Sequence, residues 1–345
     1  MRRGSGARLW PALLAAAAML LAGCGGAASP AASAPASAAA SASTASKPAE
    51  SPSASGLDTV KVAIPAKGVA YLNLYVGKDL GIFQKHGIDL QISQLSAGAA
   101  LAAAQQGQVD FLTSIASAAR LAEKGQPIRV VYVAADHDDF VLVGAKGITQ
   151  ASQLKGKVVA GATPGSELSE LAIRLLAADG LQASDYKMLY VGGGSAAVAA
   201  LTNGEVSAAM LDVADAVLMH DQGYPFIDSA VRFLLPAHGL ASSLRQIEQR
   251  GPMLRRALAA CLEATKLVAT DKAQVVPVMT KEFDLSAADA GQIFDQLKPT
   301  WVLSGRPGQD VIDEELTADQ AIQKLPAKPK ESDVYDFSLL PSTSS

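Results

Sequence analysis

GAALAAAQQGQVD, residues 98–110, and SAAVAALTNGEVS, residues 195–207, follow one pattern at a constant offset of 97 residues. Each copy has an alanine-rich helical run, a glycine (Gly107 or Gly204) at the expected helix end, a polar residue and the start of a strand. Chance similarity between alanine-rich helices is the alternative, but the shared glycine and strand onset argue against it. The repeat therefore predicts two similar lobes.

Short apolar runs alternate with helical runs around each copy. In the first series we expect strands at 60–64, 88–95, 109–113 and 128–134, and helices at 70–83, 98–106 and 117–124. In the second series we expect strands at 157–160, 187–191 and 206–211, and helices at 166–179 and 195–202. A short apolar strand at 140–143 lies between the two series. This alternation predicts an α/β fold with a largely parallel sheet, which turns mostly helical after Arg232.

The folded part of the chain is large enough to split into two domains. We expect lobe I at residues 57–141, completed by 233–326, and lobe II at 142–232. The two crossings between the lobes would form a hinge. Residues 327–345 are expected to be a C-terminal tail, and we assume a monomer.

The N-terminus is typical of an export signal. Arg2, Arg3 and Arg8 precede an apolar run at 9–22, which is short for a membrane-spanning helix. Leu21-Ala22-Gly23-Cys24 resembles a bacterial lipobox, in which the cysteine is acylated, for example with palmitate, and becomes the new N-terminus. An ordinary signal peptide with a chance cysteine is the alternative. Residues 1–23 are thus predicted to be a lipoprotein signal peptide.

Residues 24–56 consist almost entirely of Ala, Ser, Pro and Gly, so they cannot form a core and are predicted to be a flexible tether. This arrangement predicts an extracytoplasmic protein that a lipid anchor holds at the membrane. Which face of which membrane is left open.

Charge and composition exclude several classes of protein. The net charge is −4 over 345 residues, and without residues 1–23 there are 26 basic and 33 acidic residues, so a nucleic-acid partner is not expected. Two cysteines and four scattered histidines exclude a disulfide scaffold and a Cys-rich zinc site. We expect no cofactor and no metal. Cys261 lies in an apolar helical stretch and is predicted to be buried and unpaired.

The loops that follow the predicted strands are built from small residues. In open α/β sheets, ligands bind beyond the carboxyl ends of the strands, where helix N-termini present free N–H donors. Each loop alone is typical of an ordinary turn, but together they predict one cleft between the lobes. The equivalent turns at 96–98 and 193–195 would converge there, with 163–166 beside them. The candidate ligand-binding residues are Lys67, Tyr71, Ser96, Gly98, Ser114, Thr163, Gly165, Ser166, Gly193, Gly194, Ser195 and Asp212.

Two of these residues and one neighbouring polar cluster have alternative interpretations. Lys67 could be a solvated loop lysine, and Tyr71 could either stack on a flat ligand or pack in a helix. The cluster Asp136-His137-Asp138-Asp139 is interpreted as a solvated turn, with a ligand contact as the second interpretation. As a metal site it would need ligands from other loops, and none is evident in the sequence.

Several of these segments resemble one family. VKVAIP at 60–65, YLNLYVGKDLGIFQKHGIDL at 71–90, GQVDF at 107–111, LKGKVVA at 154–160, PGS at 164–166, GGGS at 192–195 and LTNGEV at 201–206 are similar to the nitrate/sulfonate/taurine-type solute-binding proteins of ABC importers. The resemblance covers residues 59–218. It implies the bilobal type II periplasmic-binding-protein fold, a small anionic or aromatic ligand and an ABC permease as partner.

Two features depart from that family. After Arg232 the family has a return strand and then a docking helix, whereas LPAHGLASSLR at 235–245 is less typical. No arginine follows any early strand, so a residue that would clamp a carboxylate or sulfonate is not visible.

We expect a binding protein rather than an enzyme. The chain has no G-x-S-x-G motif, no phosphate-binding loop and no plausible Cys–His pair. The alternatives are an extracytoplasmic ligand sensor and an enzyme of the pyrimidine-precursor type, to which the resembling family is related.

Overall fold

The computed structural model describes residues 56–341. The predicted signal peptide, the lipidation site at Cys24, nearly all of the predicted tether and residues 342–345 lie outside the described residues. Within residues 56–341, no helix is both long and apolar enough to cross a membrane.

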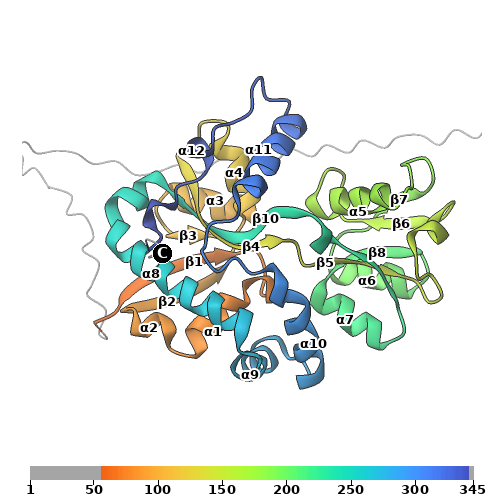
Figure 1. Cartoon of the computed structure of the whole chain (residues 1–345), viewed down its shortest axis with the longest axis horizontal. Coiled ribbons are helices and arrows are strands. Elements are labelled where there is room, and N and C mark those ends of the chain that lie inside the picture. Colours follow the sequence, from red (N-terminus) through yellow and green to blue (C-terminus); the bar gives the residue numbers. More distant parts are fainter. Residues whose placement is uncertain (1–55, 342–345) are drawn as a thin grey trace, which may run out of the picture. The chain divides into compact units, whose positions relative to one another are not determined.

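The first sheet has five strands in the order β2-β1-β3-β10-β4 (Figure 1). They are β1 (Asp58–Ile64), β2 (Ile88–Gln94), β3 (Phe111–Leu112), β4 (Ile128–His137) and β10 (Leu234–Ser243). Successive side chains of a strand point to opposite faces, and both faces here are covered. Val60, Val62 and Ile64 pack on the face covered by α1 (Leu72–Asp79) and α8 (Leu244–Thr270). Ala63 packs on the other face, against α3 (Ala97–Gln105) and α4 (Ile115–Ala122).

The second sheet has the order β7-β6-β8-β5-β9. Its strands are β5 (Phe140–Gly144), β6 (Val158–Gly161), β7 (Lys187–Tyr190), β8 (Ala208–Asp212) and β9 (Phe226–Ser229). Leu142 and Met210 pack on the face covered by α5 (Glu167–Ala178) and the short 3-10 helix η2 (Ala151–Leu154). The other face packs against α6 (Ser195–Thr202) and α7 (Val213–Asp221). The prediction of two α/β lobes is confirmed.

The sequence repeat has a structural counterpart in the two sheets. The strands that end the repeat, β3 and β8, each occupy the third position of their sheet, after α3 and α6 respectively. Gly107 and Gly204 end these helices with φ angles of 72° and 75°, a left-handed conformation that favours glycine. The shared glycine is therefore a structural requirement of the helix-to-strand turn.

Three sequence expectations differ from the structure. Each sheet is mixed rather than largely parallel, because β10 runs antiparallel to β3 and β4, and β5 runs antiparallel to β8 and β9. The chain after Arg232 is not helical at first: it returns to the first sheet as the ten-residue strand β10. The single helix expected at 70–83 is instead the 3-10 helix η1 (Val69–Tyr71), α1 and α2 (Ile82–Lys85), since Gly81 has a φ of 73°.

The chain crosses between the sheets at two places. Asp138 and Asp139 join β4 to β5, and the 3-10 helix η3 (Ala230–Arg232) with Phe233 joins β9 to β10. Phe140 and Val141, which the sequence analysis assigned to lobe I, pair with β8 in the second sheet. The first crossing is therefore a two-residue segment that carries two carboxylates.

The C-terminal part completes the first lobe. It contains α8, α9 (Lys272–Phe283), α10 (Ala287–Leu297), η4 (Lys298–Thr300), α11 (Gln309–Gln323), α12 (Glu331–Val334) and η5 (Phe337–Leu339). Cys261 is buried in α8 and has no disulfide partner among residues 56–341, and burial raises the pKa of its thiol to about 12. Tyr335 and Leu339, expected in a tail, are buried, because Tyr335 bridges to Val130 of β4.

Candidate functional site

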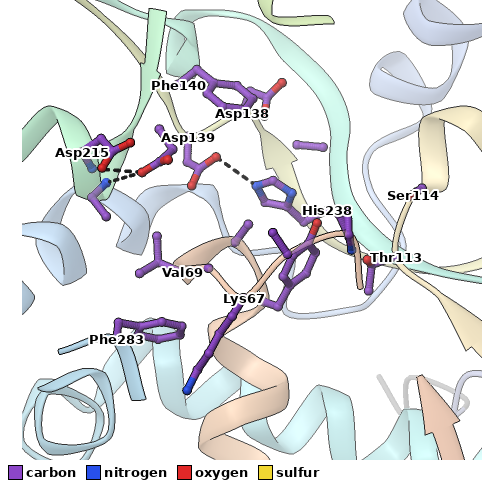
Figure 2. A pocket seen from close by; sticks show the side chains of 18 of the residues that line it. Lys67, Val69, Thr113, Ser114, Asp138, Asp139, Phe140, Asp215, His238 and Phe283 are labelled. Atoms are coloured by element: carbon purple, nitrogen blue, oxygen red, sulfur yellow. Dashed lines mark hydrogen bonds and ion pairs between the residues drawn. The ribbon is translucent and has the colours of Figure 1, made fainter. Parts of the chain in front are cut away.

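A cavity of about 820 Å³ lies where the two lobes meet at the crossings. The first lobe contributes the segment 65–71 after β1, the start of α4 and residues 237–238 of β10. The second lobe contributes Phe140 and the start of α7, and the end of α9 closes a further side. In Figure 2, Asp139, Phe140 and Asp215 lie across the cavity from Lys67, Val69 and Phe283. Cavities that bind small molecules have this size.

Four of the candidate residues line this cavity, namely Lys67, Tyr71, Ser114 and Asp212. The others do not: Ser96, Gly98, Thr163, Gly165, Ser166, Gly193, Gly194 and Ser195, although Ala97 is part of the lining. The order of the second sheet gives the reason. Asp212 ends β8, which is central, whereas the loops at 163–166 and 192–195 follow β6 and β7 at one side of the sheet. The repeat therefore does not bring its two equivalent turns to one point in this structure.

Lys67 forms an ion pair with Glu282. Its ammonium lies 2.7 Å from a carboxylate oxygen of Glu282 at the end of α9. It also lies 5.3 Å from the ring centre of Tyr75, within range of a cation–π contact. The candidate lysine thus pairs with a carboxylate 215 positions away, which Lys281 also contacts at 3.3 Å.

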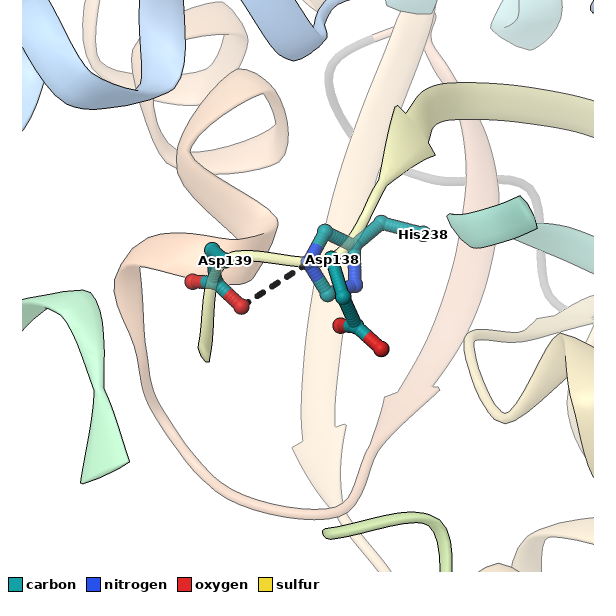
Figure 3. A group of neighbouring side chains, drawn as sticks. All are labelled: Asp138, Asp139 and His238. Carbon is teal, nitrogen blue, oxygen red and sulfur yellow. Dashed lines mark hydrogen bonds and ion pairs between the residues drawn. The ribbon is translucent and has the colours of Figure 1, made fainter. Parts of the chain in front are cut away.

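The first crossing is buried, in contrast to the expected solvated turn. Asp138 and Asp139 are 2% and 4% exposed. His238 of β10 places its Nε2 3.2 Å from Oδ1 of Asp139 (Figure 3), so a partner from a distant segment does converge on this cluster. One ligand atom each from Asp138, Asp139 and His238 lies within 4.8 Å of the others, a spacing that a metal ion could bridge. The second interpretation, a place in the ligand site, agrees with the cavity lining.

Asp212 caps helix α7. Its Oδ1 accepts hydrogen bonds from the backbone N–H groups of Ala214 and Asp215, both at 3.0 Å. Burial raises the pKa of the Asp212 carboxyl to about 6, and the neighbouring carboxylates of Asp215 and Asp139 add to the rise. The capping bonds lower it, but the first effects prevail. Negative charge is therefore crowded at this end of the cavity.

Aromatic side chains form much of the remaining wall. Tyr71 lies edge-on to His238, with the ring centres 6.2 Å apart. It is half-buried and packs against the core while it lines the cavity, so both interpretations of this residue apply. Phe140 and Phe283 line the cavity from the two lobes. These rings provide flat apolar surface on which a ligand body can pack.

Sequence reasoning did not find His238, Phe140, Asp215 and the α9 end Glu282–Asp284. Phe140 and Asp215 each lie three residues after the end of a strand, β4 and β8 respectively. His238 lies within β10, and Glu282–Asp284 lie at the end of α9. These residues differ in type and in position within their elements, so they share no sequence signal. They come together at the cavity only because α9 and β10 pack beside the first crossing.

Two α/β lobes with a ligand-sized cavity at their crossings define the class of periplasmic-binding-protein folds. A family model described as NMT1/THI5 like matches residues 69–275. Since this is more than half of the chain, the chain belongs to the NMT1/THI5-like family. Comparison with curated protein sequences finds no match.

Solved structures show the same fold at low identity. The periplasmic aliphatic sulphonate binding protein SsuA of Escherichia coli is 19% identical with a TM-score of 0.67, over 81% of this chain and 97% of that one. The alkanesulfonate-binding protein SsuA of Xanthomonas axonopodis pv. citri, bound to MOPS, is 19% identical with a TM-score of 0.62, over 82% and 98%. The desulfurization enzyme DszB is 15% identical with a TM-score of 0.62, over 82% and 97%.

Proposed function

We propose that this chain is an extracytoplasmic solute-binding protein that captures a small molecule between its lobes and delivers it to an ABC importer. The cavity carries this proposal, because both lobes, one of the crossings and the end of α9 contribute to one space of about 820 Å³. The two SsuA proteins, which bind sulfonates on the same fold, support a binding role. Lys67, Tyr71, Ser114, Asp212, Asp139 and His238 are the proposed ligand contacts.

The location follows from the N-terminal sequence. Arg2, Arg3 and Arg8, the apolar run and the lipobox at Cys24 support export and a lipid anchor, and residues 24–56 support a tether between the membrane and the lobes. A lipid-held binding protein stays close to a membrane permease. Membrane fractionation of a Cys24→Ser variant tests the anchor, and a variant that stays with the membranes would contradict it.

A thermal-shift screen tests the binding role. The compounds are sulfonates, nitrate, aromatic acids, pyrimidines, flavins and amines, and a ligand at 100 times its Kd should add about 2.7 kcal/mol of stability. Ala116→Trp, in the first turn of α4, should fill the cavity and abolish the shift with little effect on folding. Ala177→Trp, on the exposed side of α5, is the matched control and should bind normally. A ligand that still shifts Ala116→Trp as it shifts the unmodified chain would place binding elsewhere.

An enzyme on this fold is the second candidate, because DszB shares the fold. The two functions differ in the fate of the ligand. Mass spectrometry of a ligand incubated with the protein should recover it unchanged if the chain is a binding protein. A product formed at a rate that Ala116→Trp abolishes would establish an enzyme. A ligand sensor would bind in the same way, and an adjacent permease gene distinguishes transport from sensing.

A further inference from the structure

The cavity is strongly acidic. Six carboxylate side chains line it, against one lysine: Asp138, Asp139, Asp212, Asp215, Glu282 and Asp284. The lysine, Lys67, is already paired with Glu282 at 2.7 Å. Among the described lining residues there is no arginine. An anionic ligand would therefore meet repulsion from these carboxylates, and the one lysine of the lining already contacts one of them.

Asp139 has a carboxylate oxygen that lacks a donor. Its side chain is 3% exposed, and Oδ1 lies 3.2 Å from Nε2 of His238. Oδ2 is buried and has no hydrogen-bond partner among the described residues. Figure 2 shows this carboxylate directed into the cavity. A buried oxygen of this kind costs free energy until a donor reaches it, and a charged donor gives the strongest bond.

Asp212 excludes an anion from the helix end where one would otherwise bind. The N-terminus of α7 attracts negative charge, but the carboxylate of Asp212 itself accepts from the N–H groups of Ala214 and Asp215. The chain thus supplies its own anion at this position. Asp139 and Asp212 are close enough for their charges to interact, so a cation near them would relieve their repulsion.

We propose that the ligand is an organic cation, with a flat apolar body between Tyr71, Phe140 and Phe283 and a protonated amine or amidine directed at Asp139 and Asp212. This inference rests on the proposed binding function and specifies its substrate class. It departs from the anionic ligands of the two SsuA proteins. The cavity volume of about 820 Å³ favours an organic molecule over a bare metal ion, although the Asp138, Asp139 and His238 group makes a metal a necessary arm of the test.

The experiment uses ligands that match in shape and differ in charge. Calorimetry compares benzamidine, benzamide and benzoate, and a second set of tryptamine, tryptophol and indole-3-acetate. In at least one set the cation should bind about 30-fold or more tightly than both the neutral compound and the anion, as expected for a buried charge pair. Asp139→Asn should remove most of that preference while leaving the neutral compound nearly unaffected. Asp221→Asn, an exposed change on the same α7 helix that follows Asp212, should keep it.

Each contrary outcome has a distinct meaning. Tighter binding of an anion or a neutral compound overturns the cation class and leaves the binding function standing. Equal cation preference in Asp139→Asn overturns the assigned position. Stabilisation by Zn²⁺ alone, without binding of either amine, assigns the carboxylates to a metal and overturns the inference. If no compound here or in the wider screen binds, the proposed function fails as well.

Discussion

His238 can approach Asp139 because the residue after it has no side chain. A Cβ placed on Gly239 would lie 2.1 Å from the carbonyl oxygen of Tyr132 on β4 and 3.1 Å from Cδ1 of Ile115. The register of β10 against β4 shifts on both sides of His238. The close contact of the two strands therefore sets the position of the histidine at the cavity, and it depends on glycine at 239.

We expect Gly239→Ala to destabilise the fold by about 2–3 kcal/mol, because one strand must move to admit the methyl group. Urea denaturation measures this change. Gly98→Ala is the control: nothing lies within 4 Å of the position that a Cβ would take there, and the residue sits in α3, so stability should stay equal or rise by up to about 1 kcal/mol. Equal stability of Gly239→Ala and the unmodified chain would show that β10 can shift freely.

At the scale of elements, helices α4 and α11 meet through a cluster of acids. Arg120 Nε lies 2.9 Å from Asp319 Oδ1, and Asp319 is only 1% exposed. Burial raises the pKa of Glu123 to about 7, and the charge of Asp319 adds to the rise. The pKa of Glu123 is lowered by Gln323, Arg120 and Lys124, but burial prevails. The charges of Asp319 and Glu123 also act on the buried side chain of Tyr335. The contact between these helices is therefore sensitive to pH.

The direction of this sensitivity follows from the raised pKa. The folded chain holds a proton on Glu123 up to about pH 7, whereas the unfolded chain loses it near the ordinary value of 4.5. The contribution that protonated Glu123 makes to the stability of the fold is thus complete below pH 4.5 and is lost as the pH rises to about 7. Glu123→Gln should be more stable than the unmodified chain at pH 8 by about 1–2 kcal/mol, after allowance for solvent screening, and similar at pH 4.5.

Thermal unfolding of the two proteins from pH 4.5 to 8 checks this expectation. Glu170→Gln, an exposed change on α5, is the control and should show no such divergence. A constant difference between Glu123→Gln and the unmodified chain across this range would contradict the assigned proton.

For the whole molecule, we propose that the two crossings act as a hinge between the lobes. The first is the pair Asp138–Asp139, and the second is η3 with Phe233. Two short connections between packed lobes are typical of hinge closure around a ligand. The loops at 163–166 and 192–195 lie outside the cavity in this structure, and we propose that closure brings them towards the ligand.

Small-angle scattering should therefore show a smaller radius of gyration once a ligand is bound. The Ala116→Trp protein, which cannot fill its cavity with ligand, should show no change with the same compound. Identical scattering of the unmodified protein with and without a bound ligand would count against closure, but not against binding.

The loops after β1, β3 and β8 could be assigned to the cavity from sequence because the carboxyl ends of neighbouring strands share one edge. The loops that contain Ser96, Thr163 and Gly193 follow their strands in the same way, yet these residues lie outside the cavity. The reason is that the position of a loop along the sheet edge depends on the strand order. Strand β10 was missed because Pro236, His238 and Gly239 weaken its local pattern, and pairing with β4 stabilises it instead.

The sequence by itself determined the two α/β lobes, because the period of apolar residues and the glycine-ended repeat are local properties of the chain. Only the tertiary structure decided the charge of the cavity. Glu282 reaches Lys67 across 215 residues, and His238 reaches Asp139 across 99. Contacts over such separations follow from how helices and strands pack. The candidate lysine is therefore paired within the fold, and Asp139 and Asp212 are the carboxylates that we propose receive a cation.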